Sequence, residues 1–167
     1  MRADTNDAPI AYFPGFLDDG DALTFQHALR HDITWRPAEG YSVGMDHGEQ
    51  FPSSAVISLL RSRLQHQTGQ NLEACRPVRL HTGADAMGYQ ADDSISDNDR
   101  PTLMVFLGEP RPITLRTRGG INETEVMLDH GALLVLQAGA ERSHEYAFWE
   151  ADSLEESIVL IFKGIKA

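Results

Sequence analysis

The chain has 167 residues, 41% hydrophobic and 23% charged, a composition that is ordinary for a globular protein and that argues against disorder. Its 25 acidic and 14 basic side chains give a net charge of −11, which disfavours binding to the phosphate backbone of nucleic acids. The only cysteine, Cys75, excludes an intramolecular disulfide and a thiolate metal cluster, and we expect it to be a small buried apolar residue.

We expect a single domain over residues 1–167, with residues 1–8 as a frayed tail. The start of the chain is polar and lacks the apolar core of a signal peptide. The apolar runs are far too short to cross a bilayer. These features predict a cytoplasmic protein without membrane contact.

The first part of the chain predicts short strands around a helix. Residues 10–13 are an apolar strand candidate, closed by a Pro-Gly turn. A helix capped by Asp18 or Asp19 is expected to run to about residue 30. Residues 33–36 form another short strand candidate, and the Gly-rich stretch 38–50 reads as a long loop.

A second helix is the clearest element, because apolar residues recur at helical spacing between a cap at Ser53 or Ser54 and an end near Gly69. After it, short segments rich in Val, Ile, Leu, Thr and Phe alternate with Gly, Pro, Asp and Asn. Strands are expected near residues 78–81, 87–90, 103–107, 113–116, 123–128, 132–136, 144–148 and 157–163. Helices followed by many short strands predict an α+β fold, an antiparallel sandwich or barrel with helices on one side.

Three side chains could form a metal site: Gln90, Asp92 and His144. Two imidazoles and one carboxylate suit a non-haem iron(II) centre, because they leave coordination positions open. Alternation along a strand puts Gln90 and Asp92 on one face. The amide oxygen of Gln90 is, however, a weaker iron(II) ligand than an imidazole nitrogen. On spacing alone, a structural role for these residues is favoured over a metal site.

Several segments resemble the AlkB family of iron(II)/2-oxoglutarate dioxygenases, in the right order along nearly the whole chain. The resemblance implies a double-stranded β-helix, a cupin-like jelly roll, with the N-terminal helices packed on one sheet. The segments that carry it are residues 12–17, 33–35, 83–93, 101–116, 130–136, 143–146 and 157–163. It places the metal ligands at Gln90, Asp92 and His144.

The same resemblance places the co-substrate positions on altered residues. The two arginines that hold 2-oxoglutarate fall on Ser157 and Lys163, and the Asn and Tyr that also touch it fall on Val78 and Leu80. Strand alternation gives Ser157 and Lys163 the same face. A serine hydroxyl replaces a charged fork by one neutral donor, and a lysine keeps the charge without the planar fork. We therefore expect the pocket to have lost its original ligand.

These substitutions predict a catalytically impaired pseudoenzyme that serves as a binding or regulatory module and carries no cofactor. Its partner would be a protein or a small molecule rather than nucleic acid. The alternative is an active oxygenase that uses iron(II) and 2-oxoglutarate to demethylate or hydroxylate a nucleobase or a protein side chain. A third possibility is a filled pocket with the function on an outer surface, for example in a dimer.

Other features favour structural roles. Arg111, Arg116 and Arg118 are expected at a solvated strand edge. The aspartates within 92–99 are expected in a solvated acidic loop rather than a Ca²⁺ site, since the spacing is not that of an EF-hand. His130 is expected at a turn. His47 and His81 could rebuild a metal site with His144. For the aromatic residues, core packing is the default expectation; these are Trp35, Tyr89 and Trp149.

Overall fold

The computed structural model describes residues 9–44, 54–89, 97 and 99–165. The elements in chain order are β1 (Ile10–Phe13), α1 (Asp19–Asp32), β2 (Arg36–Pro37), β3 (Ser42–Val43), α2 (Ala55–Thr68), β4 (Ala74–Leu80), β5 (Thr102–Gly108), β6 (Arg111–Thr117), β7 (Glu123–Leu128), β8 (Ala132–Leu136), α3 (Ala140–Ser143), β9 (His144–Phe148) and β10 (Ser157–Lys163). The predicted tail, residues 1–8, lies outside the described residues.

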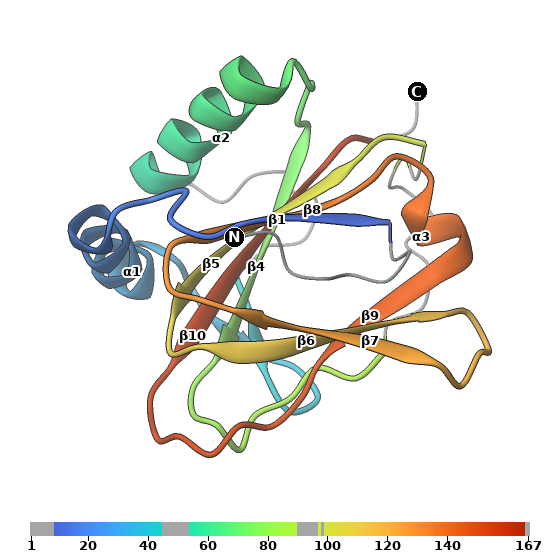
Figure 1. Cartoon of the computed structure of the whole chain (residues 1–167). Coiled ribbons are helices and arrows are strands. Elements are labelled where there is room, and N and C mark those ends of the chain that lie inside the picture. Colours follow the sequence, from blue (N-terminus) through green and yellow to red (C-terminus); the bar gives the residue numbers. More distant parts are fainter. Residues whose placement is uncertain (1–8, 45–53, 90–96, 98, 166–167) are drawn as a thin grey trace.

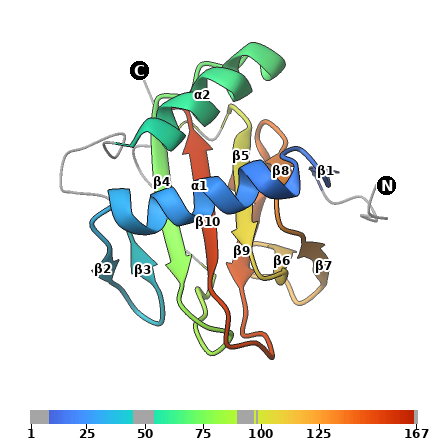
Figure 2. The ribbon, with the colours of Figure 1, turned by 90° about the vertical axis from the view of Figure 1, so that its left-hand side faces the viewer.

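The elements form three layers (Figure 1). A large sheet has the strand order β1-β8-β5-β10-β4-β3-β2, and a second sheet has the order β7-β6-β9. Helices α1 and α2 cover the face of the large sheet that points away from the second sheet (Figure 2). The pairings are antiparallel throughout the named strands. The predicted α+β double-stranded β-helix with helices on one sheet is confirmed.

The two long helices begin and end where their capping residues predict. The side chain of Asp18 accepts the backbone N–H of Asp21 at the start of α1, and that of Ser54 accepts the backbone N–H of Ile57 at the start of α2. Helix α2 ends at Gly69, whose φ of 69° is the left-handed conformation that favours glycine. Local capping chemistry thus sets the helix boundaries.

The large sheet is buried on both faces. In β10, Ile158, Leu160 and Phe162 belong to the core under the helices, whereas Val159 and Ile161 belong to the core between the two sheets. β10 itself lies between β4 and β5. A strand in this position is apolar on both faces, which explains why its sequence shows no alternation of polar and apolar residues.

Several predicted boundaries differ from the structure. The strand predicted at 33–36 is the two-residue β2, and the predicted loop contains β3, which pairs with β4. β4 begins at Ala74, earlier than predicted, and the short helix α3 was not predicted. Of the strand predicted at 87–90, the structure shows one isolated antiparallel bridge from Met87 to Phe148. In the described part of the chain, no helix is both long enough and apolar enough to span a membrane.

Candidate functional site

The four predicted co-substrate positions lie on the inner face of the large sheet. Ser157 is paired with Leu80 across the β10–β4 ladder, and Val159 is paired with Val78. Because side chains alternate along a strand, Ser157 and Lys163 share the inner face of β10 with Val159 and Ile161. The structure thus gives Ser157 and Lys163 the common face that alternation predicts.

Ser157 and Lys163 stand at opposite ends of this face. Six residues of strand separate them by about 20 Å. Two arginines are long enough to reach one ligand from positions this far apart, whereas the short side chain of Ser157 is not. The Ser157 side chain is fully buried, and its hydroxyl donates to the Glu109 carbonyl oxygen at 2.8 Å. Val78 and Leu80 are fully buried in the apolar core between the sheets.

The inner face therefore does not fit 2-oxoglutarate in the arrangement that the resemblance implies. At the Ser157 end, the hydroxyl is already bonded to the backbone and its neighbours Leu80 and Val78 are hydrocarbon. A dicarboxylate placed along this face would put one charged end against buried apolar side chains, which costs several kcal/mol by the order of magnitude known for unpaired buried charges.

A guanidinium does lie at that end, but it is bound to the protein's own backbone. Arg111 is 1% exposed and shares the face of β6 that carries Ile113 and Leu115. Its Nη atoms donate to the carbonyl oxygens of Thr82 at 2.7 Å, Asp85 at 2.6 Å and Trp149 at 3.1 Å.

Burial lowers the pKa of Arg111. The predicted solvated strand edge is wrong for this residue. Arg116 and Arg118, from the same predicted edge, are also bonded within the chain, to the Glu145 carboxylate and the Glu141 carbonyl oxygen respectively.

The Lys163 end is polar. Lys163 Nζ lies 3.1 Å from Glu141 Oε1, and the Thr102 hydroxyl donates to the other Glu141 oxygen at 2.6 Å. Arg76, on the inner face of β4, donates to the Tyr41 hydroxyl at 3.3 Å. The polar cluster consists of Tyr41, Arg76, Thr102, Glu141, Tyr146 and Lys163.

Tyr146 is one of five members of the polar cluster that sequence reasoning missed, since Lys163 alone was a candidate. Its side chain is 7% exposed and packs edge-to-face on Phe148, with 6.0 Å between ring centroids. Burial raises the pKa of its phenol, and the charges of Lys163, Glu141 and Arg76 act on the same group. Strand alternation could have found this residue, because it lies two positions after His144.

His144 is the predicted metal ligand that the structure describes. It is the first residue of β9, and its Nδ1 is hydrogen-bonded to the Ser143 hydroxyl at 2.7 Å, which leaves Nε2 as the nitrogen for a metal. Gln90 and Asp92 lie outside the described residues. Among residues 9–44, 54–89, 97 and 99–165, no three His, Cys, Asp or Glu side chains group as metal ligands.

Of the two other histidines of the alternative metal site, the structure describes His81. His81 follows β4 at its Leu80 end, where its Nε2 is hydrogen-bonded to the Ser42 hydroxyl at 2.9 Å. His144 lies at the other end of the second sheet, since the bridge from Met87 to Phe148 occupies the far end of β9. His81 and His144 thus lie apart in the described structure, and they belong to no group of three metal-ligating side chains among the described residues. His47 lies outside the described residues.

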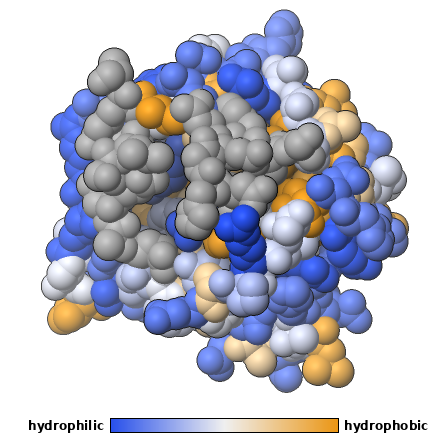
Figure 3. Space-filling model, turned by 180° about the vertical axis from the view of Figure 1, so that it is seen from behind, coloured by the Kyte–Doolittle hydropathy of each residue, from blue (hydrophilic) through white to orange (hydrophobic). Residues whose placement is uncertain are grey.

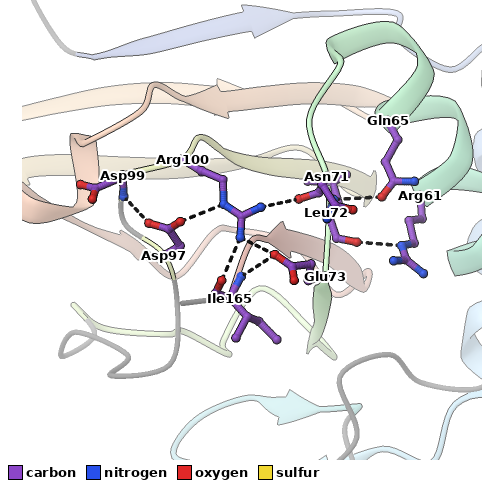
Figure 4. A network of polar contacts seen from close by, with 9 residues as sticks. All are labelled: Arg61, Gln65, Asn71, Leu72, Glu73, Asp97, Asp99, Arg100 and Ile165. Carbon is purple, nitrogen blue, oxygen red and sulfur yellow. Dashed lines mark hydrogen bonds and ion pairs between the residues drawn. The ribbon is translucent and has the colours of Figure 1, made fainter. Parts of the chain in front are cut away.

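The side chain of Arg100 joins several chain segments at the end of the fold next to Lys163 (Figure 4). Arg100 donates to the Asp97 carboxylate at 2.9 Å, to the Asn71 and Ile165 carbonyl oxygens at 3.1 and 2.9 Å, and to the Glu73 carboxylate. These contacts tie the chain before β5 to the start of β4 and the end of β10. Asp97 is thus ion-paired while remaining partly exposed, and Asp99 of the same predicted acidic loop is largely exposed. Asp92 and Asp93 lie outside the described residues.

The remaining candidates have structural contacts. His130 Nδ1 accepts the backbone N–H of Gly108 at 2.8 Å, as expected for a turn residue. Tyr89 and Trp149 pack edge-to-face, 5.6 Å apart, and both bond to the Thr114 hydroxyl. Thr114 alternates with the core residues of β6, so this aromatic pair lies on the outer face of the second sheet and not in the core. Cys75 is fully buried, as predicted.

Comparison with known proteins supports the architecture. No protein-family model matches the sequence, and no curated protein matches it. Among solved structures, an oxidoreductase of the 2OG-Fe(II) oxygenase family from Burkholderia pseudomallei is similar, with a TM-score of 0.65 and 11% sequence identity. The match covers 94% of this chain and 86% of that one. The chain therefore has the double-stranded β-helix fold of a 2OG-Fe(II) oxygenase.

Proposed function

We propose that this chain is an AlkB-like, catalytically impaired oxygenase-fold protein that serves as a binding or regulatory module. The observation that carries the proposal concerns Ser157, the position on which the resemblance places an arginine: its side chain is fully buried, and its hydroxyl donates to the Glu109 carbonyl oxygen. Its neighbours Leu80 and Val78, on which the resemblance places an Asn and a Tyr, are buried hydrocarbon side chains.

The altered positions remove several interactions with a dicarboxylate at once. A hydrogen bond to a charged group contributes about 1.5–3 kcal/mol net, so a lost arginine fork alone weakens a carboxylate ligand by roughly one to two decades or more. Lys163 retains a charge, but Glu141 already pairs with it. The four positions that the resemblance assigns to the co-substrate thus offer 2-oxoglutarate one paired cation in place of two arginines and two polar neighbours.

The partner is proposed to be a protein or a small molecule. Three arginines of residues 111–118 donate to acceptors within the chain; they are Arg111, Arg116 and Arg118. Their guanidinium groups are therefore not arranged as a row of cations that could bind the phosphates of a nucleic acid. The face seen in Figure 3 is mostly hydrophilic over the described residues, with small and scattered apolar spots. The bonded arginines and the net charge of −11 argue against nucleic acid.

One observation favours the alternative, an active oxygenase. His144 begins β9 with its Nδ1 bonded to Ser143, an arrangement that would orient Nε2 toward a metal. Iron(II) held by Gln90, Asp92 and His144 would supply the activation of oxygen. Its substrate would be a nucleobase or a protein side chain, the substrate classes that the AlkB resemblance suggests.

The two functions are separated by anaerobic addition of iron(II) and 2-oxoglutarate to the purified protein. We expect no charge-transfer absorption from a metal-bound keto acid and, after oxygen is admitted, no succinate. An active enzyme of the same fold, assayed in parallel, shows that the reagents are competent. Succinate formation that disappears in both Asp92→Ala and His144→Ala would overturn the proposal in favour of the active oxygenase.

A further inference from the structure

We infer that the open edge of β7 binds an extended, basic segment of a partner protein, which adds to the second sheet as a further antiparallel strand. The segment carries lysine or arginine opposite Glu123 and Glu125 and an apolar residue opposite Met127. The inference deepens the proposed binding role, and it rests on that proposal in one respect: the partner is a protein. None of the positions that the AlkB resemblance assigns to metal or co-substrate lies on β7.

The backbone bonds between β6 and β9 show which way each residue of β6 faces. The second sheet has the order β7-β6-β9, so β7 is its edge strand among the described residues (Figure 2). The backbone N–H of Arg118 donates to the Ser143 carbonyl oxygen at 2.9 Å, just past the β6–β9 ladder. Bonded and non-bonded pairs alternate along an antiparallel ladder. Arg116 therefore directs its backbone groups toward β9, and Leu115 directs its own toward β7.

A contact on the far side of β9 agrees with this alternation. Ile113 is paired with Phe148 and, like Leu115, faces β7 with its backbone groups. Phe148 must then direct its backbone groups away from β6. It does so, because Phe148 and Met87 exchange two backbone hydrogen bonds, each of 2.8 Å.

The alternation leaves three residues of β7 with backbone groups directed at the open edge. Thr124 is paired with Leu115 and bonds toward β6. Glu123, Glu125 and Met127 therefore direct their N–H and C=O groups away from β6. An added strand gains affinity from main-chain hydrogen bonds of this kind and specificity from its alternate side chains.

The side chains of the same three residues lie on the outer face of the second sheet. Val126 and Leu128 belong to the core between the sheets, so Glu123, Glu125 and Met127 point away from it. Met127 is 49% exposed, and both glutamates are exposed. In a bonded pair, the facing residue of an added strand lies directly opposite, with its Cβ about 4.5–5.5 Å away on the same face. Every second residue of the partner thus contacts one of these side chains.

The charge of the edge selects a basic partner. β7 contains two carboxylates and no basic residue. Two neighbouring cations bond elsewhere: Arg116, across the ladder from Glu123, pairs with Glu145 at 2.7 Å, and Arg118 donates to a carbonyl oxygen of α3. Within the described chain, neither Glu123 nor Glu125 is ion-paired. Opposite charges that face each other across a ladder stabilise strand pairing.

The same charges disfavour a second copy of this chain as the occupant. In a twofold antiparallel pairing of two β7 strands centred on Thr124 or Glu125, carboxylates would face carboxylates directly. Like charges in that position destabilise a ladder. A separate basic segment meets no such repulsion.

The test is a titration of the protein with the acetylated and amidated peptide Thr-Val-Thr-Lys-Thr-Lys-Thr, followed by backbone NMR. In the antiparallel register, the valine lies opposite Met127 and the two lysines lie opposite Glu125 and Glu123. We expect saturable shifts of the amide signals of these three residues, and slower hydrogen exchange of the same amides in the complex.

Charge variants test the contribution of the carboxylates. Glu125→Gln should weaken binding about threefold, and the double variant Glu123→Gln/Glu125→Gln about tenfold, because one and two opposite-charge pairs are lost. Glu39→Gln is the matched control: it removes the same charge from an exposed residue between β2 and β3 and should not affect binding. Circular dichroism establishes that each variant is folded.

Modified peptides separate strand addition from simple attraction of charges. N-methylation of both lysines keeps their charge but removes the N–H groups that bond to β7, and it should weaken binding about tenfold or more. N-methylation of the two threonines that precede the lysines, whose N–H groups point away from β7, should leave binding unchanged. Sedimentation velocity should show a monomer without the peptide.

Four results would each overturn the inference. They are absent shifts, unchanged binding by the folded double variant, equal binding of the lysine-methylated peptide, and a dimer that the peptide dissociates, which would make a second copy the occupant of the edge. Failure of the proposed function is read separately. Succinate formation refutes the impaired oxygenase but leaves peptide binding standing, whereas absent peptide binding without succinate removes this partner alone.

Discussion

Arg79 of β4 donates its Nε–H to the Glu156 carboxylate at 2.8 Å, just before β10 begins. Arg30 of α1 donates to the other oxygen of that carboxylate at 2.7 Å, so the group joins the helix layer to the large sheet. Glu156→Gln leaves two partly buried guanidinium groups without their counter-charge. We expect a loss of about 3 kcal/mol in the free energy of unfolding, measured by urea denaturation at pH 7.

The same carboxylate predicts a pH dependence of stability. Burial raises the pKa of Glu156, but the hydrogen bond from Arg30 and the charge of Arg79 outweigh it and hold the pKa below its usual value. A depressed folded-state pKa stabilises the protein above the unfolded-state pKa, and this contribution is lost as the pH falls through the folded-state pKa. The stability difference between the parent and Glu156→Gln should therefore shrink below about pH 4.5. A constant difference from pH 7 to pH 3 would contradict this.

Substitution of Arg111 is expected to lower the free energy of unfolding strongly, through lost hydrogen bonds to the backbone. Arg111→Met removes a buried side chain that donates to three carbonyl oxygens, at Thr82, Asp85 and Trp149. Because each orphaned group costs about 1–3 kcal/mol, we expect a loss of at least about 3 kcal/mol in thermal or urea unfolding. Arg116→Met is the control: its pair with Glu145 is partly exposed, and about 1 kcal/mol or less is expected. Equal effects in the two variants would refute the structural role assigned to Arg111.

Substitution of Gly108 tests how closely the end of β5 packs against the start of β10. Its φ is 105°, and an added Cβ would lie 2.4 Å from the Glu156 carbonyl oxygen. Gly69 also has a positive φ, of 69°, but an added Cβ there meets nothing within 4 Å. Gly69→Ala should therefore cost about 1 kcal/mol, from backbone strain alone. Gly108→Ala should cost clearly more, and equal losses in thermal unfolding would exclude the steric contact.

The sequence predicts the fold well where the determining chemistry is local. Ser54 and Gly69 cap α2 through contacts within one turn, and the apolar run of β10 reflects a strand buried on both faces. Arg111 could not be foreseen, because its three acceptors come from segments 26 to 38 residues away. Its burial is a property of the assembled sheets.

The segment after Met87 shows the limit of strand alternation. Met87 lies in the core between the sheets, whereas Tyr89, two residues later, bonds to Thr114 on the outer face of the second sheet. Regular alternation would put both side chains on one face. The common face predicted for Gln90 and Asp92 falls outside the described residues and stays a prediction. Arg76 and Tyr146, in regular strands, were within reach of the same reasoning.

The central position of β10 sets the order in which the fold can be completed during synthesis. β10 follows both of its neighbours, β4 and β5, in the chain. Until the ribosome has released it, the large sheet is split into two halves whose facing edges lack a partner, and such edges invite pairing with other chains. Nascent chains arrested before residue 157 should accordingly depend on chaperones.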